Sequence, residues 1–183
     1  MQNETTKKVC VYCASSPLID EVYFKNTEKL AKLLVQKQVE FVFGGGAKGL
    51  MGQLADTVIA EGGKITGIMP HFMRELEWAH EKVQQFHFTQ TMHERKQRFL
   101  EGIDAIITLP GGCGTLEEVL EVITLKRLGL FDKPIILLSI GDFYKPLEEM
   151  LEKCISEKFM TEEHRNIWHF VKEPEEVLQV LGW

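Results

Sequence analysis

The chain lacks most features that mark membrane, secreted or nucleic-acid-binding proteins. Its 183 residues include no hydrophobic run that approaches the ~20 residues of a membrane-spanning helix. Residues 1–8 are polar and lead directly into a short apolar stretch, which is not the pattern of a secretory signal peptide. The formal net charge is −6, whereas broad binding to nucleic acid or to anionic membranes relies on positive charge. We therefore expect neither nucleic acid nor a membrane among its partners.

Cysteine is also scarce, and its four positions do not suggest a disulfide framework. Cys10 and Cys13 have the spacing C-x-x-C, but they lie in an apolar run that predicts a strand, where residues three apart point to opposite faces. Cys113 and Cys154 have no partners at the spacing of a zinc site. The six histidines lack metal-ligand spacing as well. We expect reduced cysteines, a cytoplasmic location, no metal site and no cofactor.

What the chain does have is a regular alternation of strand-like and helix-like segments. A hydrophobic content of 44% is enough for one core, so we expect a single domain over residues 1–183. Alternation of this kind is typical of β-α-β units and predicts an α/β fold, a doubly wound, Rossmann-like parallel sheet with helices on both faces. Strands are predicted at residues 9–13, 41–43, 64–69, 83–88, 105–109, 134–139 and 167–171, and helices near 21–38, 49–61, 92–101, 144–158 and from 115 and 175 onward.

The most informative segment is residues 108–118, Thr-Leu-Pro-Gly-Gly-Cys-Gly-Thr-Leu-Glu-Glu, between a predicted strand and a predicted helix. Glycines at such a turn let backbone N–H groups converge on an anion, and the helix N-terminus adds its positive dipole end. We therefore predict a phosphate site formed by Gly111, Gly112, Gly114 and Thr115.

Glu118 follows this turn and has two possible roles. Thr115 and Glu118 fit a capping box, with threonine as N-cap and glutamate three residues later, which is a purely structural role. Alternatively, a carboxylate beside a phosphate site is suited to chemistry on a phosphorylated small molecule. The spacing alone leaves both open.

Two other small-residue turns follow predicted strands. Gly44, Gly45 and Gly46 begin a G-x-G-x-x-G pattern, but the acidic residue expected about 20 positions later in a dinucleotide site is missing. Taken alone, this turn is equally well explained as a tight strand-to-helix connection. Ser15 lies in the turn after the first strand. Because ligands of such sheets bind at the carboxyl ends of the strands, these residues are further candidates for phosphate binding.

Arg95 is the third candidate for chemistry. On the helix predicted near residues 92–101, Met92, Arg95 and Phe99 share one face. An arginine on an apolar face needs an anionic partner, and its guanidinium can bind either a phosphate or a carboxylate through two hydrogen bonds. A ligand phosphate or Glu118 could therefore be its partner.

These segments together resemble a known family. Residues 110–118 fit the P-G-G-x-G-T-x-x-E motif of the LONELY GUY (LOG) family, and residues 92–96 fit its companion element M-x-x-R-K. Residues 9–16, the triple-glycine turn with residues 49–52, and residues 121–124 are also similar and occur in the same order. The resemblance extends from about residue 8 to about residue 161.

The resemblance implies a phosphoribohydrolase that cleaves the N-glycosidic bond of cytokinin-type or adenosine 5′-monophosphates, releasing the free base and ribose 5-phosphate. It implies a nucleoside 5′-monophosphate substrate, a homodimer and a catalytic pair that maps onto Arg95 and Glu118. Members are often labelled lysine decarboxylases, but that reaction uses a pyridoxal cofactor on a lysine, for which we see no basis. Four further substrate contacts are implied, at Glu77, Met92, Lys96 and Thr124.

Two other functions stay open on the sequence. The chain could be a carrier that binds a nucleotide or cofactor without cleaving it, or a structural module in which both glycine turns are merely tight turns. Release of free base distinguishes the enzyme from the carrier, and thermal stabilisation by nucleoside monophosphates distinguishes either one from the module. For the enzyme we favour an ionised Glu118, because a helix N-terminus and a nearby arginine both stabilise the charged form.

Overall fold

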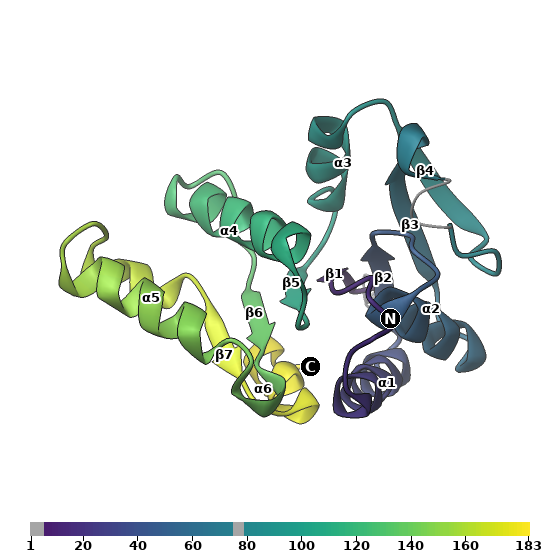
Figure 1. Cartoon of the computed structure of the whole chain (residues 1–183), viewed down its shortest axis with the longest axis horizontal. Helices are drawn as coiled ribbons and strands as arrows, with labels where there is room; N and C mark the ends of the chain where they lie inside the picture. The colour runs from purple at the N-terminus through teal and green to yellow at the C-terminus, as the bar shows by residue number, and fades with distance from the viewer. Residues whose placement is uncertain (1–5, 75–78) are drawn as a thin grey trace, which may run out of the picture.

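A computed structural model describes residues 6–74 and 79–183 of the chain. Its centre is a sheet of seven strands, paired in parallel in the order β4-β3-β2-β1-β5-β6-β7 (Figure 1). The strands are β1 (Lys8–Tyr12), β2 (Glu40–Phe43), β3 (Ile65–Pro70), β4 (Gln85–Thr89), β5 (Ala105–Thr108), β6 (Ile135–Leu138) and β7 (His169–Val171). The α-helices described are α1 (Glu21–Gln36), α2 (Gly49–Ala60), α3 (Met92–Phe99), α4 (Cys113–Arg127), α5 (Lys145–Ser156) and α6 (Pro174–Leu181).

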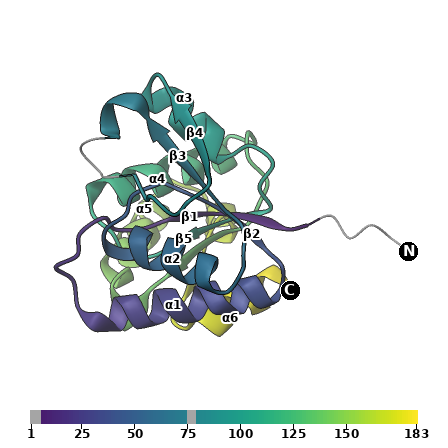
Figure 2. The same ribbon diagram turned by 90° about the vertical axis from the view of Figure 1, so that its right-hand side faces the viewer.

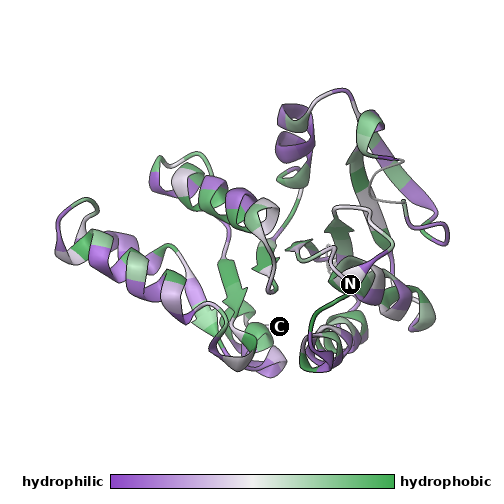
Figure 3. Ribbon diagram, in the orientation of Figure 1, coloured by the Kyte–Doolittle hydropathy of each residue, from purple (hydrophilic) through white to green (hydrophobic). Residues whose placement is uncertain are grey.

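Helices cover both faces of the sheet, as the alternating pattern predicts. Side chains of β1 alternate between two buried clusters, so that Val9 and Val11 pack with α1, α2 and α6, whereas Cys10 and Tyr12 pack with α3, α4 and α5. Helices α1 and α6 lie side by side beneath the strands (Figure 2). The central strands are hydrophobic along their length, and the helices carry polar residues on their outer sides (Figure 3). The prediction of a doubly wound α/β fold is confirmed.

The C-x-x-C pair also behaves as its spacing predicts. Cys10 belongs to the cluster on one side of the sheet and Cys13 to the cluster on the other. All four cysteines are free thiols in the structure.

The order of the strands determines where a ligand can bind. From β1 the chain continues outward to β2, β3 and β4, and then returns to β5 on the opposite side of β1. The winding direction therefore reverses between β1 and β5, which is the position at which doubly wound sheets bind ligands, outside the carboxyl ends of the strands. The turns that follow β1, β2 and β5 meet at this edge. None of the helices within the described residues has the length and hydropathy to cross a membrane.

Helix α4 begins two residues earlier than the sequence predicts. Its N-cap is Gly112, in an extended conformation, and its first residue is Cys113. Thr115 therefore lies inside the first turn, and no side chain caps the helix. The predicted helix start at Thr115 was wrong, because glycine gives no side-chain signal of a helix start. Of the two roles that the sequence leaves open for Glu118, the capping box with Thr115 is not formed. The carboxylate of Glu118 is consequently not used as a helix cap.

Candidate active site

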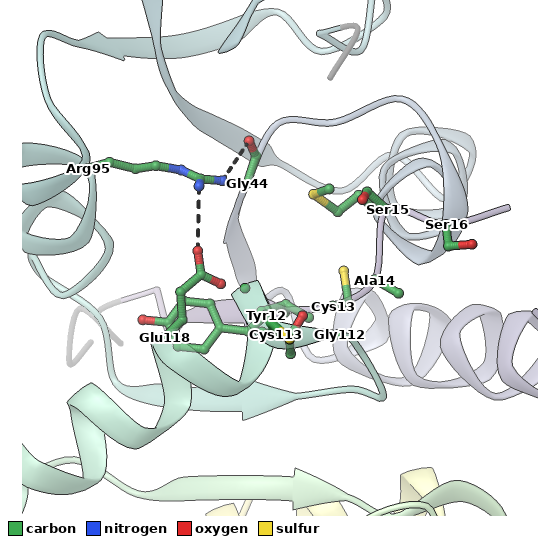
Figure 4. Close-up of a pocket in the computed structure, with 14 residues that line it drawn as sticks. Tyr12, Cys13, Ala14, Ser15, Ser16, Gly44, Arg95, Gly112, Cys113 and Glu118 are labelled. Atoms are coloured by element: carbon green, nitrogen blue, oxygen red, sulfur yellow. Dashed lines mark hydrogen bonds and ion pairs between the residues drawn. The ribbon is translucent and has the colours of Figure 1, made fainter. Parts of the chain in front are cut away.

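A cavity of about 340 Å³ opens at the carboxyl ends of the central strands. Its wall is formed by residues 11–16, at and after the end of β1, by Gly44 and Met51 near α2, by Arg95 of α3, and by the start of α4 with Glu118 (Figure 4). Residues from four separate parts of the chain therefore meet around one space, at the place that the strand order indicates.

Arg95 and Glu118 face one another across this cavity. The Nη1 atom of Arg95 lies 3.6 Å from Oε1 of Glu118, and the two side chains are 7% and 13% exposed. Their charged groups point toward each other in Figure 4. The buried arginine and the partly buried carboxylate stabilise each other's charge, which offsets part of the cost of removing both groups from water. Of the two partners that the sequence leaves open for Arg95, the structure places the carboxylate within ion-pair distance.

The guanidinium of Arg95 is held from two further sides. Its Nε donates a hydrogen bond to the carbonyl of Ile68 at 3.1 Å, and Nη2 donates to the carbonyl of Gly44 at 3.4 Å. Its central carbon lies 5.0 Å from the centre of the Phe99 ring, one turn along the same helix. Backbone carbonyls and an aromatic face thus fix the plane of the guanidinium, which leaves Nη1 directed at Glu118.

The start of α4 supplies donors for an anion. The backbone N–H groups of Cys113, Gly114 and Thr115 have no acceptor within the helix, since its first internal bond runs from Leu116 to Gly112 at 3.0 Å. These groups and the helix dipole favour a negatively charged ligand at this end of the cavity. Gly111 has a packing role, because a β-carbon there would come within 2.1 Å of the Thr115 hydroxyl oxygen.

The turn after β1 is locked between α2 and the glycine turn after β5. Ala14 donates its N–H to the carbonyl of Pro110 at 3.2 Å, and its own carbonyl accepts from Leu50 at 2.9 Å and Met51 at 3.3 Å. Ser15 lines the cavity next to it. The first amides of α2 are therefore occupied by the carbonyl of Ala14. The N-terminus of α4, not that of α2, is the helix start available to a phosphate.

The triple-glycine turn reaches the cavity only through its first residue. Gly44 lines the cavity and accepts from Arg95. Gly45 accepts the backbone N–H of His80 at 3.0 Å, and Gly46 pairs with Ala79 in an isolated bridge. Gly45 and Gly46 thus fasten the segment that precedes β4, which is the tight-turn role that the sequence also allowed.

Three of the candidate substrate contacts lie away from the cavity wall. Met92 is 37% exposed at the start of α3, and Thr124 is exposed and donates to the carbonyl of Leu120 at 2.9 Å. Lys96 forms ion pairs with two glutamates of α4. A fourth candidate, Glu77, lies outside the described residues.

The structure adds residues that the sequence did not single out. Tyr12, Cys13 and Met51 line the cavity, and the Tyr12 ring packs edge-on against Phe99 at 5.5 Å. Burial raises the pKa of the Cys13 thiol, and the negative charge of Glu118 raises it further. The pKa of the Tyr12 hydroxyl is raised first by burial and then by its neighbours, including Glu118. Both side chains therefore stay neutral beside the carboxylate. The sequence signal that could have identified Tyr12 and Cys13 was their position at the end of β1.

Comparison with known proteins identifies the family. A family model described as possible lysine decarboxylase matches residues 51–181. The rice (Oryza sativa subsp. japonica) protein named probable cytokinin riboside 5′-monophosphate phosphoribohydrolase LOGL2 is 37% identical over 175 residues, which cover 96% of this chain and 72% of that protein. Cytokinin riboside 5′-monophosphate phosphoribohydrolase LOG5 of Arabidopsis thaliana is also 37% identical over 175 residues, covering 96% and 77%. The chain belongs to the LOG family.

Solved structures share the fold of this LOG family member at lower identity. The molybdenum cofactor binding protein of Rippkaea orientalis superposes with a TM-score of 0.71 at 19% identity, over 98% of this chain and 97% of that one. The molybdenum cofactor carrier protein of Chlamydomonas reinhardtii has a TM-score of 0.72 at 17% identity, over 97% of each chain. These similarities establish the doubly wound fold alone.

Proposed function

We propose that this LOG family member hydrolyses the N-glycosidic bond of adenosine-type nucleoside 5′-monophosphates, releasing the free base and ribose 5-phosphate. The observation that carries the proposal is the pair of buried Arg95 and partly buried Glu118 in one cavity with the N-terminus of α4. An anion-binding helix start and a reactive carboxylate are the two elements that this reaction requires. The names of the relatives point to the same chemistry.

In the proposed reaction, the start of α4 holds the 5′-phosphate. The amides of Cys113, Gly114 and Thr115 bind the phosphate oxygens and so fix the ribose relative to Glu118. Holding the ribose in place relative to Glu118 lowers the activation barrier by several kcal/mol, because binding has already removed the translational and rotational freedom that the reaction would otherwise cost.

The bond-breaking step places positive charge on the ribose. As the bond between C1′ and the base breaks, its electron pair leaves with the base, which takes up a proton from solvent that balances the one given up by the attacking water. The carboxylate of Glu118 stabilises the oxocarbenium-like ribose and accepts a proton from the attacking water as the new C1′–O bond forms. Arg95 keeps this carboxylate ionised and in place.

The proposal includes a homodimer in the cytoplasm and one catalytic domain over residues 1–183. The family resemblance suggests the dimer, and exposed leucines on and just after α4 (Leu120, Leu128, Leu130) support it, since exposed apolar side chains gather at interfaces. The free cysteines fit a reducing compartment. Sedimentation of the full chain tests the dimer.

The alternative is a carrier that binds a nucleotide or cofactor and leaves it intact, on the scaffold shared with the two molybdenum cofactor proteins. Glu118 argues against this alternative. A carboxylate beside an anion site repels the ligand, so a carrier gains nothing from it, whereas hydrolysis uses it. Both functions predict that AMP raises the melting temperature.

The experiment that separates them is a substrate screen with product analysis. The protein is incubated with AMP, with a cytokinin riboside 5′-monophosphate, and with the matching nucleosides and triphosphates, and the free base and ribose 5-phosphate are measured. We expect both products in equal amounts from the monophosphates and none from the nucleosides, which lack the group that α4 binds. Stabilisation by AMP with quantitative recovery of AMP would instead identify a carrier.

A further inference from the structure

A second pocket, of about 570 Å³, lies beside β4, the edge strand of the sheet (Figure 1). We call it the β4 pocket. The described residues that line it come from β4 (Phe86 and Phe88), from the segment before this strand (residues 79–81 and Val83) and from the segment after β3 (Arg74). None of them is among the described residues that line the candidate active site. The β4 pocket is therefore a separate space, and its volume is in the range of small-molecule sites.

The wall that β4 contributes to this pocket is aromatic. Phe86 and Phe88 are two residues apart on the strand and so lie on the same face, and their rings stack with centroids 5.5 Å apart and an angle of 12° between the planes. Two glycines make room for the Phe86 ring, because a β-carbon at Gly45 or at Gly67 would lie 2.7 Å or 2.4 Å from one of its carbons. Phe88 is 36% exposed. The two rings thus form a partly uncovered surface on which a planar ring can stack.

Arg74 brings positive charge to the same pocket. The central carbon of its guanidinium lies 5.5 Å from the centre of the Phe88 ring. Arg74 is exposed, and it forms no ion pair with a carboxylate of the described residues, Glu81 of the pocket lining included. A guanidinium that lies over a ring keeps the N–H donors in its own plane, and these match a carboxylate through two hydrogen bonds. The β4 pocket therefore combines an anion site with an aromatic surface.

His80 adds an unpaired polar atom to the wall of the β4 pocket. Its side chain is 6% exposed, and Nε2 lies 3.6 Å from Oδ1 of Asp56 on α2. The other ring nitrogen, Nδ1, is buried and has no hydrogen-bond partner within the described part of the chain. Buried polar atoms are nearly always paired, so an unpaired one marks a place where a polar group of a ligand would gain a partner. This observation is independent of Arg74 and of the stacked rings.

We propose that the β4 pocket binds a small planar aromatic anion, with its ring on the surface of Phe86 and Phe88 and its carboxylate on Arg74. An aliphatic anion would leave the aromatic wall uncovered, and a neutral ring would leave the guanidinium without a counter-charge. Only a ligand with both features satisfies both parts of the pocket. The site takes no part in the proposed hydrolysis, so its test does not depend on that reaction.

The probe is 2-naphthoate, titrated into the full chain by calorimetry beside two matched compounds. Naphthalene-2-methanol has the same rings without the charge, and cyclohexanecarboxylate has the charge without an aromatic ring. We expect 2-naphthoate to bind at one site in each chain. Each of the other two compounds should bind at least about tenfold more weakly, because each lacks one of the two contacts. Absence of 2-naphthoate binding, or equal binding of naphthalene-2-methanol, would overturn the inference.

Phe88→Leu and Arg74→Gln remove the two contacts one at a time. Each should weaken the binding of 2-naphthoate by about tenfold, and Arg74→Lys, which keeps the charge but loses the planar group, should fall between Arg74→Gln and the wild-type protein. Phe72→Leu is the matched control, because Phe72 is even more exposed than Phe88 but is not part of the pocket lining. All these side chains are exposed, so the variants should fold. Binding that Phe88→Leu and Arg74→Gln leave unchanged would show that the probe occupies another place.

Competition with AMP distinguishes the β4 pocket from the candidate active site. Glu118→Gln, which we expect not to cleave AMP, is titrated with 2-naphthoate in the absence and in the presence of excess AMP. The two affinities should agree within about twofold, since separate sites without coupling bind independently. Displacement of 2-naphthoate by AMP would place the probe in the active-site cavity and overturn the inference. Failure of the wild-type protein to release base from any monophosphate would instead refute the proposed function alone.

Discussion

Arg95 and Glu118 are 3.6 Å apart, although one is anchored to the β2–β3 side of the sheet and the other lies on the helix that follows β5. The pair therefore exists only when both halves of the doubly wound sheet are assembled. This relationship explains why the site lies where the winding direction reverses, and it makes the pair sensitive to changes at several distant positions.

Replacing Arg95 by alanine should affect both turnover and stability. The substitution removes the guanidinium that donates to the carbonyls of Ile68 and Gly44, and it removes the ion pair between Arg95 and Glu118. We expect release of base from AMP to fall below detection and the free energy of unfolding to drop by about 1–3 kcal/mol. Urea denaturation and the product assay measure the two effects. An Arg95→Ala protein with normal turnover would exclude Arg95 from the mechanism.

The two glycines beside the anion site should respond differently to alanine. A β-carbon on Gly111 would clash with Thr115, whereas one on Gly114 meets nothing within 4 Å, and neither position has a positive φ. We expect Gly111→Ala to lower the free energy of unfolding by about 1–3 kcal/mol because of overpacking. Gly114→Ala should leave it unchanged within about 0.5 kcal/mol. Equal melting temperatures for the two variants would contradict this packing role of Gly111.

The Tyr144 hydroxyl supports the strand end from which the anion site begins. It is buried and donates to the carbonyl of Leu109 at 2.7 Å. Tyr144→Phe leaves that buried carbonyl unpaired, and we expect a loss of about 1–3 kcal/mol in the free energy of unfolding. Tyr23→Phe, at a half-buried tyrosine whose ring packs against Phe143, is the control and should cost less than about 0.5 kcal/mol. Calorimetry of both variants measures the two losses in the free energy of unfolding. Equal losses would contradict the role of the Tyr144 hydroxyl.

Thiol reactivity should divide the cysteines by their position. Burial raises the pKa of Cys10 and Cys13, and the charge of Glu118 adds to both shifts, so neither forms the reactive thiolate near pH 8. Cys113 is exposed at the start of α4 and lines the cavity. Iodoacetamide should therefore modify Cys113 and spare Cys10 and Cys13 in the folded protein, as peptide mass mapping can show.

Modification of Cys113 has a functional consequence. An added carboxamidomethyl group would occupy the space that we propose for the phosphate, so we expect the treated protein to lose turnover and ribose 5-phosphate to slow the loss. In Cys113→Ser the remaining activity should resist the reagent. If that variant is inactivated at the wild-type rate, the sensitive group lies elsewhere.

Much of the fold could be predicted because its signals are local. Buried strands such as residues 105–108 are continuous apolar runs, and the inward position of Arg95 follows from its helical spacing to Phe99. The start of α4 was missed because an extended glycine at the N-cap leaves no side-chain signature. The order of the strands depends on pairing between distant segments, which the alternating pattern does not encode.

Some features of the site likewise follow from the local sequence, and others depend on residues that are far apart in the chain. The motif around Gly111 predicts the helix start that we propose as the anion site. The difference between the two glycine turns depends on Ala14, whose carbonyl accepts from the amides of Leu50 and Met51 of α2. Likewise, nothing near Lys96 in the sequence reveals that Glu117 and Glu121 are its partners. Contacts of this kind become visible only when the chain is folded.

The most direct test of the central claim compares the wild-type protein with Glu118→Gln on AMP. This substitution keeps the shape of the side chain but removes the charge that, in the proposed reaction, stabilises the ribose cation and accepts the proton from water. We predict that the wild-type protein forms adenine and ribose 5-phosphate in equal amounts, and that Glu118→Gln forms neither while AMP still raises its melting temperature. Intact AMP with the wild-type protein, or undiminished adenine release by Glu118→Gln, would contradict the account.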